Sequence, residues 1–371
     1  MKRNGIGRIV ILVALGLVLG AGLLGAEEKI QLAILLDTSN SMDGLIGQAK
    51  SQLWKVVNEL ARAKRNGKHP QLEVGLFEYG NDGLPESDGY MRMVSNLTTD
   101  LDAISADLFA LSTDGGSEYC GMVIDRAVTK LSWSKASDVL KIIYIAGNEP
   151  FTQGDVSYKK SCARAVAQGI IVNTIFCGDN NEGVETFWKD GADRADGRYM
   201  SIDQDRVVED VPTPYDQEIV TLGNQLNGTY VAYGSAGEVS KSRQAEQDSN
   251  ASSVGAAAPV ERSVAKAQSA YSNAGWDLLD ALQQKSVNLS TLKDADLPQA
   301  MRGMTLAQKE KYVKDLAAKR VEIQQKINAD NEKRRTFLAN AAKAATQANT
   351  LDQAMLTSIH DQAKKEGFSI E

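Results

Sequence analysis

The sequence predicts an α/β fold, a doubly wound and mainly parallel open sheet flanked by helices, followed by an α-helical C-terminal region. Between residues 27 and 233, apolar runs typical of buried strands alternate with segments of helical spacing. Beyond residue 260 the strand patterns stop, and apolar residues recur at helical intervals. A chain of 371 residues has room for one large domain and a smaller one.

The strands expected in the α/β domain, residues 27–233, are short apolar runs bounded by turn residues. The first, at 31–36, contains a single polar residue, which is the pattern of a strand covered on both faces. Further strands are expected at 72–79, 90–95, 139–146, 170–177 and, at one edge, 198–202. Helices are expected between them at 45–65, 100–111, 118–133, 155–168, 184–192 and 217–226, and the run TYVAY at 229–233 closes the domain.

Residues 234–259 differ in composition from the domain before them. They are rich in Ser, Ala, Gly and charged residues and contain almost no large apolar side chain. This composition predicts a linker or a loosely held helix. The helical region that follows is expected to span 260–371.

Two helices are expected first in the C-terminal region, one at 264–285 and a long one that ends near residue 343. Thr305 and Gln308 have the spacing of a capping box, which marks the start of the long helix. Apolar residues within it fall on coiled-coil spacing for barely two heptads, and Arg320 interrupts the seam. We therefore expect an α-hairpin or small bundle, packed on itself or on the α/β domain, and no long free coiled coil.

The first 26 residues have the pattern of a cleaved export signal: a basic start, an apolar centre and small residues at Gly25-Ala26. The alternative is an uncleaved membrane anchor, although the apolar run is slightly short for a full span. The segment carries three positive charges and no negative ones, so its removal changes the net charge from −7 to −10. An acidic protein is not expected to bind nucleic acid or to coat an anionic membrane. We expect a periplasmic or secreted protein with no membrane span after cleavage.

Three cysteines in an exported chain permit one disulfide and leave one thiol over. Spacing does not identify the pair. Cys177 ends an apolar run and has the pattern of a small buried residue, so the expected pair is Cys120 with Cys162. With only two histidines in the chain, a histidine-based triad or zinc site is not expected.

The residues that carry chemistry follow the first expected strand. Asp37 ends the apolar run, and Ser39 and Ser41 follow at spacings of two and four. A tight turn there directs three side-chain oxygens, one of them anionic, toward a common point, and oxygen ligands suit Mg²⁺ or a similar hard ion. The alternative is that these residues only form a turn and cap a helix.

Two further loops are expected at the same edge of the sheet, where open α/β folds bind their ligands. In one loop, a pair of glycines at 115–116 precedes Ser117, which offers a hydroxyl. In the other, Asn148 follows the most apolar strand and offers an amide oxygen. For each loop taken alone, an ordinary turn is an equally good interpretation.

The region from residue 30 to 233 resembles a von Willebrand factor A-type (vWA) domain with a metal-ion-dependent adhesion site. The Asp-x-Ser-x-Ser motif is intact, and Ser117 stands where the family usually has threonine. The chain departs from the family after the fourth expected strand, residues 139–146, where Gly147 occupies the position of the usual aspartate. This removes one negative charge, which Glu149 is placed to restore, while Asn148 offers a neutral oxygen. The signal and the helical C-terminal part also resemble exported bacterial proteins that contain such a domain.

The resemblance implies a non-enzymatic, metal-dependent protein-binding module for adhesion or complex assembly. Mg²⁺ or another divalent cation would be held at the sites named above, and a partner protein would complete its shell with an acidic group. The alternative is a metal-free structural or scaffolding protein assembled through its helical region. A hydrolase is disfavoured because no P-loop is present and no candidate serine has a histidine nearby.

Overall fold

The computed structural model describes residues 28–205, 210–342 and 351–370. The expected export signal at 1–26 lies outside these ranges. Within them, no helix combines the length and the apolar character that a membrane crossing requires.

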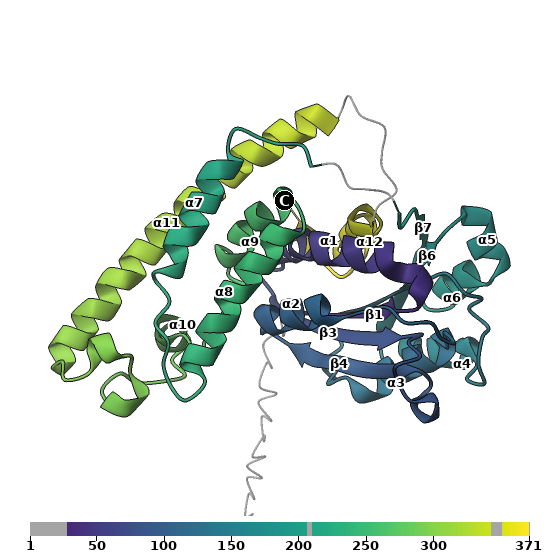
Figure 1. The fold of residues 1–371 in the computed structure, drawn as a ribbon, viewed down its shortest axis with the longest axis horizontal. Coiled ribbons are helices and arrows are strands. Elements are labelled where there is room, and N and C mark those ends of the chain that lie inside the picture. Colours follow the sequence, from purple (N-terminus) through teal and green to yellow (C-terminus); the bar gives the residue numbers. More distant parts are fainter. Residues whose placement is uncertain (1–27, 206–209, 343–350, 371) are drawn as a thin grey trace, which may run out of the picture.

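A six-stranded sheet forms the centre of the protein (Figure 1). Its order is β4-β3-β1-β5-β6-β7, and every neighbouring pair is parallel except β3 with β4. The strands are β1 (Lys29–Asp37), β3 (Gln71–Tyr79), β4 (Met91–Thr98), β5 (Leu140–Gly147), β6 (Ile170–Cys177) and β7 (Tyr199–Ile202). The predicted doubly wound, mainly parallel class is confirmed, with the first strand at its centre.

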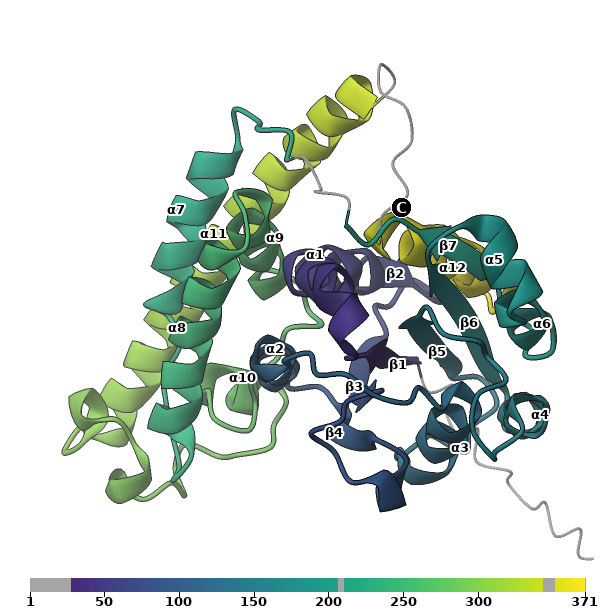
Figure 2. The ribbon, with the colours of Figure 1, turned by 45° about the vertical axis from the view of Figure 1, so that its right-hand side comes forward.

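Helices cover both faces of the sheet (Figure 2). Alternate residues of β1 face opposite cores: Leu32 and Leu36 point to one, and Ala33 and Leu35 to the other. On the first face lie α1 (Asp43–Ala61), α2 (Leu101–Ala110) and α12 (Leu351–Lys365). On the second lie α3 (Cys120–Lys130), α4 (Tyr158–Ala167) and α6 (Trp188–Asp193), which follows α5 (Asn180–Glu185).

A layer of helices packs beside α1 and α2: α7 (Asp216–Asn227), α8 (Gly237–Ser253), α9 (Ala257–Lys266) and the long α11 (Leu306–Ala342) (Figure 1). Val264 of α9 and Ile323 of α11 belong to the same hydrophobic core as Trp54 of α1. The C-terminal helices therefore pack on the α/β domain and share its core.

Residues 234–259, expected to be a linker or a loosely held helix, are largely the helix α8, so the linker interpretation is corrected. The helix lacks large apolar residues because polar side chains fix it in place. Gln247 accepts a hydrogen bond from Ser105 of α2 at 2.8 Å, and Arg243 pairs with Asp100. The spacing of apolar residues in a sequence does not reveal polar contacts of this kind.

Buried charges reinforce the junction between these layers. Arg262 of α9 donates to Asp102 of α2 at 2.8 Å, both side chains being about 1 % exposed, and its guanidinium lies 4.6 Å from the ring centroid of Trp54. Lys266 reaches Asp248 of α8 at 2.9 Å. A buried ion pair of this kind fixes the partners in one register.

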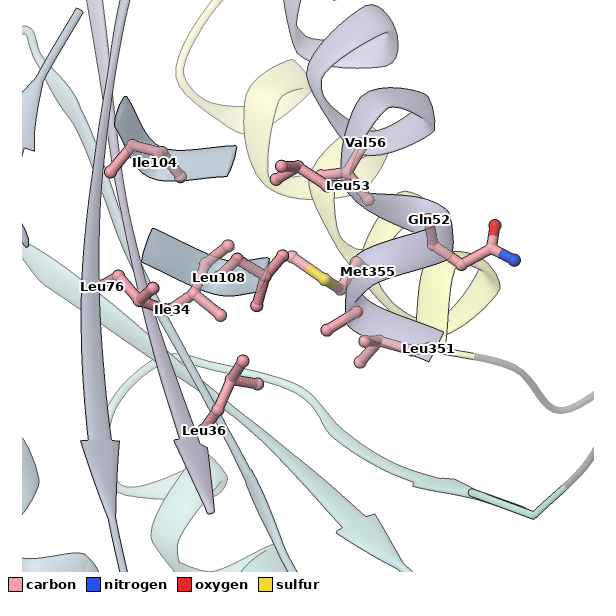
Figure 3. A pocket seen from close by; sticks show the side chains of 11 residues that line it. Ile34, Leu36, Gln52, Leu53, Val56, Leu76, Ile104, Leu108, Leu351 and Met355 are labelled. Atoms are coloured by element: carbon pink, nitrogen blue, oxygen red, sulfur yellow. The ribbon is translucent and has the colours of Figure 1, made fainter. Parts of the chain in front are cut away.

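The last helix, α12, returns to the sheet next to α1. Leu351 and Met355 point toward a small apolar cavity of about 30 Å³ that α1, α2 and the sheet also line (Figure 3). The Tyr144 hydroxyl of β5 lies 2.5 Å from that of Ser358. Residues 351–370 thus cover the α/β sheet, and a two-residue pairing of β2 (Ala63–Lys64) with β8 (Ser369–Ile370) ends the chain.

Three local expectations have different outcomes. The single helix expected at 264–285 is wrong: α9 ends at Lys266, and Asp277 caps a separate α10 (Leu278–Gln283) by accepting the N–H of Asp280 at 3.0 Å. The helix at 184–192 is two short helices, divided at Phe187 with φ of 72°. The capping box is confirmed, since the Thr305 N–H donates to Gln308 Oε1 at 2.8 Å. Short 3₁₀ helices occupy Asn40–Met42, Glu86–Asp88, Asp294–Asp296 and Gln299–Met301.

All three cysteines are buried and free, so the expected Cys120–Cys162 disulfide is wrong. Cys120 Sγ lies 3.9 Å from the Tyr79 hydroxyl, whereas Cys162 Sγ lies 3.5 Å from the carbonyl oxygen of Gly191. Each thiol fills its own place in the core as a small apolar group.

Candidate metal centre

The candidate site begins where β1 ends. Asp37 pairs in register with Tyr79 of β3, and the next N–H, that of Thr38, donates to the Tyr79 carbonyl at 2.8 Å. Asp37 is fully buried: its Oδ1 accepts the Ser39 N–H at 2.8 Å, and its Oδ2 has no partner among the described residues. The end of β1 thus holds the Asp37 carboxylate in place, and among the described residues one of its two oxygens accepts no hydrogen bond.

The hydroxyls of Ser39 and Ser41 lie 3.2 Å apart beside this carboxylate. Neither the 3₁₀ turn at Asn40–Met42 nor α1 has a side-chain cap. Ser39 precedes this turn and Ser41 lies in it, as the alternative of an ordinary turn expects, but neither hydroxyl caps a helix. Asn148, from the loop after β5, donates from Nδ2 to Ser41 Oγ at 3.2 Å. Four of the five predicted residues meet at this edge.

Ser117 lies in the loop between α2 and α3, which approaches the same edge. The Asp114 N–H donates to the Thr38 carbonyl at 3.0 Å and ties this loop to the end of β1. Ser117 is half-buried, and among the residues that the structure describes no hydrogen bond joins it to the other four. Ser117 is therefore near the site because its loop is held there, and it makes no direct hydrogen bond with the other four residues in the part of the chain that the structure describes.

The residue that sequence reasoning missed as part of the site is Glu118. Its side chain is 3 % exposed, and its Oε2 has no partner among the described residues. A Cβ placed on Gly80 would lie 2.6 Å from Glu118 Cγ and 2.8 Å from Asp37 Oδ1, so the two carboxylates face each other across this glycine. The available signal was its position directly after Ser117, in a loop already assigned to this edge.

The two carboxyl groups resist ionisation together. Burial raises the pKa of Asp37 to about 7, Ser39 opposes the rise through its hydrogen bonds, and the charge of Glu149 adds to it. Burial also raises the pKa of Glu118 to about 8, with repulsion from Asp37 as the next cause. A proton or a cation therefore has a favourable place between them.

Gly147 has no room for the aspartate that the family carries at this position. A Cβ there would lie 2.5 Å from the Tyr79 hydroxyl and 2.8 Å from Asp37 Oδ2. The Tyr79 hydroxyl is itself held by donating to the Ala146 carbonyl at 2.9 Å. Side chains from the ends of β3 and β1 fill the space next to this end of β5, so only a glycine fits at position 147 without a shift of its neighbours.

The donors at this edge fit a hard divalent cation. They are oxygens of two carboxylates, two hydroxyls and one amide, and two of the carboxylate oxygens are buried without a partner. Within the described ranges no group of three or more His, Cys, Asp or Glu side chains is arranged to hold a metal. A cation here would accordingly need the serine hydroxyls, and water, to complete its shell.

The sheet order and the Asp-x-Ser-x-Ser turn at the end of its central strand have the arrangement that the resemblance to a vWA-type domain predicts. No family model matches the chain, and no curated protein matches its sequence. Among solved structures, BatB from Bacteroides thetaiotaomicron aligns with 47 % of this chain and 90 % of its own, at 17 % identity and a TM-score of 0.36.

Two further solved structures are similar over the same region. The SpRpn10 VWA domain aligns with 47 % of this chain and 88 % of its own, at 18 % identity and a TM-score of 0.36. Proximal thread matrix protein 1 from the mussel byssus, described with zinc in its metal-ion-dependent adhesion site, aligns with 49 % of this chain and 43 % of its own. Its identity is 12 % and its TM-score is 0.35.

With a chelator present, the free energy of unfolding is expected to fall as the pH rises from about 4 to about 8. Unfolded carboxyls ionise near pH 4, whereas folded Asp37 and Glu118 keep their protons until about pH 7 and pH 8. The folded state therefore binds more protons than the unfolded state in this window. The stability that the protonated pair contributes is complete below about pH 4 and is lost as the pH rises through about 7 for Asp37 and about 8 for Glu118.

Urea unfolding in EDTA at pH 5 and pH 8 measures this effect. Relative to wild type, the double variant Asp37→Asn/Glu118→Gln should lose on the order of 6 kcal/mol of the difference between the two pH values. An identical pH dependence in both proteins would show that the pair ionises normally.

Proposed function

We propose that the protein is an exported, non-enzymatic module that binds a partner protein through a divalent cation, in adhesion or in the assembly of a complex. The observation that carries the proposal is the buried Asp37 carboxylate: its Oδ2 has no hydrogen-bond partner among the described residues, and Ser39 and Ser41, which follow it in the turn, have hydroxyls that cap neither the turn nor α1. A buried carboxylate oxygen without a partner costs free energy, and a cation would remove that cost.

The cation would be Mg²⁺ or another hard divalent ion, held by oxygens directly or through water. The residues proposed to hold it are Asp37, Ser39, Ser41, Ser117 and Asn148. Ser41 is exposed and Asn148 half-buried, so one side of the ion would face solvent. An acidic group of a partner protein would bind there. The acidic net charge of the chain makes nucleic acid an unsuitable partner.

Thermal unfolding with and without divalent cations tests this proposal. A ligand that binds only the folded state, at 100 times its Kd, stabilises it by about 2.7 kcal/mol. We therefore expect Mg²⁺ or Mn²⁺ to raise the Tm of wild type by several degrees and to leave Asp37→Asn unchanged.

The matched control is Asp114→Asn, which alters an exposed carboxylate in the neighbouring loop. It should respond to the cation as wild type does. Equal Tm values for wild type with the cation and with EDTA would refute the proposal. For the partner, capture that persists in EDTA would exclude a cation bridge.

The second candidate function is a metal-free scaffold. The observation that favours it is Gly147, which leaves the third loop without a carboxylate at the family position. In that case Asp37 and Glu118 would share a proton instead of a cation, and the helical layer would make the contacts. The cation experiment above separates the two functions.

Export is proposed from the pattern of residues 1–26. The mass of the protein recovered from outside the cytoplasm should correspond to a chain that begins at Glu27. A full-length mass in the membrane fraction would indicate an uncleaved anchor instead.

A further inference from the structure

Among the described residues, the charged groups that act most strongly on Asp37 and Glu118 are all carboxylates. Asp37, Glu118 and Glu149 influence one another, and no lysine or arginine among the described residues forms an ion pair with Asp37 or Glu118. Buried carboxylates elsewhere in the protein do have basic partners, as Asp102 has Arg262 and Asp277 has Arg320. Asp37 and Glu118 differ from these carboxylates, and a proton or a cation would offset the repulsion between them.

Glu118 is held in place from three directions. Its N–H donates to Gln153 Oε1 at 2.5 Å, which fixes its backbone to the loop after β5. Its carbonyl accepts the N–H of Cys120, the first residue of α3, at 3.2 Å. Its Cγ lies against Gly80, where a Cβ would approach it to 2.6 Å. These contacts fix the backbone of Glu118 and the first part of its side chain, so the carboxylate has a defined position in the site.

The family position for a carboxylate in the third loop is closed, because any Cβ on Gly147 would meet Tyr79 and Asp37. Asn148 in that loop offers only a neutral oxygen. Glu118 comes from the second loop and faces the same Asp37 from across Gly80. Both of these carboxylates keep one buried oxygen without a partner, Asp37 Oδ2 and Glu118 Oε2.

We propose that Glu118 is a ligand of the cation, and that it supplies from the α2–α3 loop the negative charge that the loop at Gly147 cannot supply. This inference rests on the proposed function, since it assigns a further ligand to the same site. Two internal carboxylates balance the charge of a divalent ion within the protein. The cation is then retained by the folded chain itself, before any partner binds.

Binding of Mn²⁺ to the purified protein, followed by electron paramagnetic resonance and by displacement with Mg²⁺, tests this assignment. Wild type should bind one Mn²⁺. Because the number of charged ligands sets the affinity of such sites, Glu118→Gln should raise the Kd for Mn²⁺ by about tenfold or more. Glu118→Asp, which keeps the charge on a shorter side chain, should raise it less.

The matched control is Glu149→Gln, which removes the same charge from a half-buried residue of the third loop. Its Kd should rise clearly less than that of Glu118→Gln, because Glu149 acts on Asp37 through its charge and is not proposed as a ligand. The melting temperature of each variant in EDTA shows that it is folded. Glu118→Gln should melt close to wild type there, because glutamine has nearly the shape of the protonated carboxyl group that Glu118 carries without a cation.

The outcomes separate the two proposals. If wild type binds Mn²⁺ and Glu118→Gln binds it equally well, Glu118 is not a ligand and only this inference fails. If Glu149→Gln and Glu118→Gln lose affinity equally, the effect is one of general charge and the inference also fails. If wild type binds no Mn²⁺, the proposed function fails together with it.

Discussion

A chain that ends at residue 342, before α12, is expected to lose its cooperative unfolding transition. The missing segment buries four large apolar side chains in the core of the α/β domain: Leu351, Met355, Ile359 and Phe368. At about 1.5–3 kcal/mol for each, their removal costs roughly 6–12 kcal/mol. A typical domain has a free energy of unfolding of about 5–15 kcal/mol, so little or no stability would remain.

Polar contacts make the loss larger. Ser358 lies 2.5 Å from the Tyr144 hydroxyl, and Gln362 Oε1 accepts the buried Asn173 amide N–H at 3.0 Å. Without α12 these groups of β5 and β6 lose their partners. Thermal melting followed by circular dichroism measures the outcome.

The control is the full chain with Gln353→Ala and Thr357→Ala, two exposed positions of α12, which should melt close to wild type. A truncated chain that unfolds cooperatively near the wild-type temperature would mean that residues 28–342 fold without α12.

Replacement of Arg320 by methionine should lower the free energy of unfolding by about 3–5 kcal/mol. The guanidinium is buried, donates to Asp277 Oδ2 and Asp280 Oδ1 at 2.7 Å each, and lies 4.3 Å from the ring centroid of Tyr230. It also donates to the Thr229 carbonyl at 2.7 Å. The variant would leave the buried Asp277 and the half-buried Asp280 without the cation that both contact.

Arg335→Met is the matched control, because it removes the same side chain from the same helix. Arg335 pairs with Glu332 at the surface, and such pairs contribute about 1 kcal/mol or less. Adding Asp277→Asn and Asp280→Asn to Arg320→Met should recover part of the lost stability. Urea unfolding of these variants gives the comparison, and equal losses for Arg320→Met and Arg335→Met would contradict the role assigned to the buried network.

Arg320 also shows where sequence reasoning stops. In the sequence it interrupts an apolar seam, which correctly argues against a long coiled coil. Its partners Asp277 and Asp280 lie 40 or more positions earlier. Apolar periodicity reports which face of a helix is buried, but it does not report which buried charge finds which partner.

The parallel sheet was predictable because its strands are continuous apolar runs. A strand that is buried on both faces needs apolar side chains at nearly every position, so the pattern is visible in the sequence. The helix α8 was not predictable in the same way, since Gln247 and Arg243 attach it through polar contacts. The place of α12 was also hidden, because an amphipathic helix does not indicate which distant surface covers its apolar face.

The candidate site also has a part that the sequence predicts and a part that depends on packing. Asp37, Ser39, Ser41 and Asn148 could be brought together from the sequence, because the ends of parallel strands lie at one edge of a sheet. The contribution of Glu118 depends on the close approach of Gly80, and the closure of Gly147 depends on the Tyr79 hydroxyl. Both are consequences of packing between loops, which residue spacing does not encode.

The position of α12 has a consequence for how the chain acquires its structure. The central strand β1 begins at residue 29, whereas the helix that covers it ends at residue 365. Contacts over such a separation form late, because a long loop must close before they contribute. The core around β1 is therefore completed only when residues 351–365, more than 300 positions away in the sequence, have packed against it.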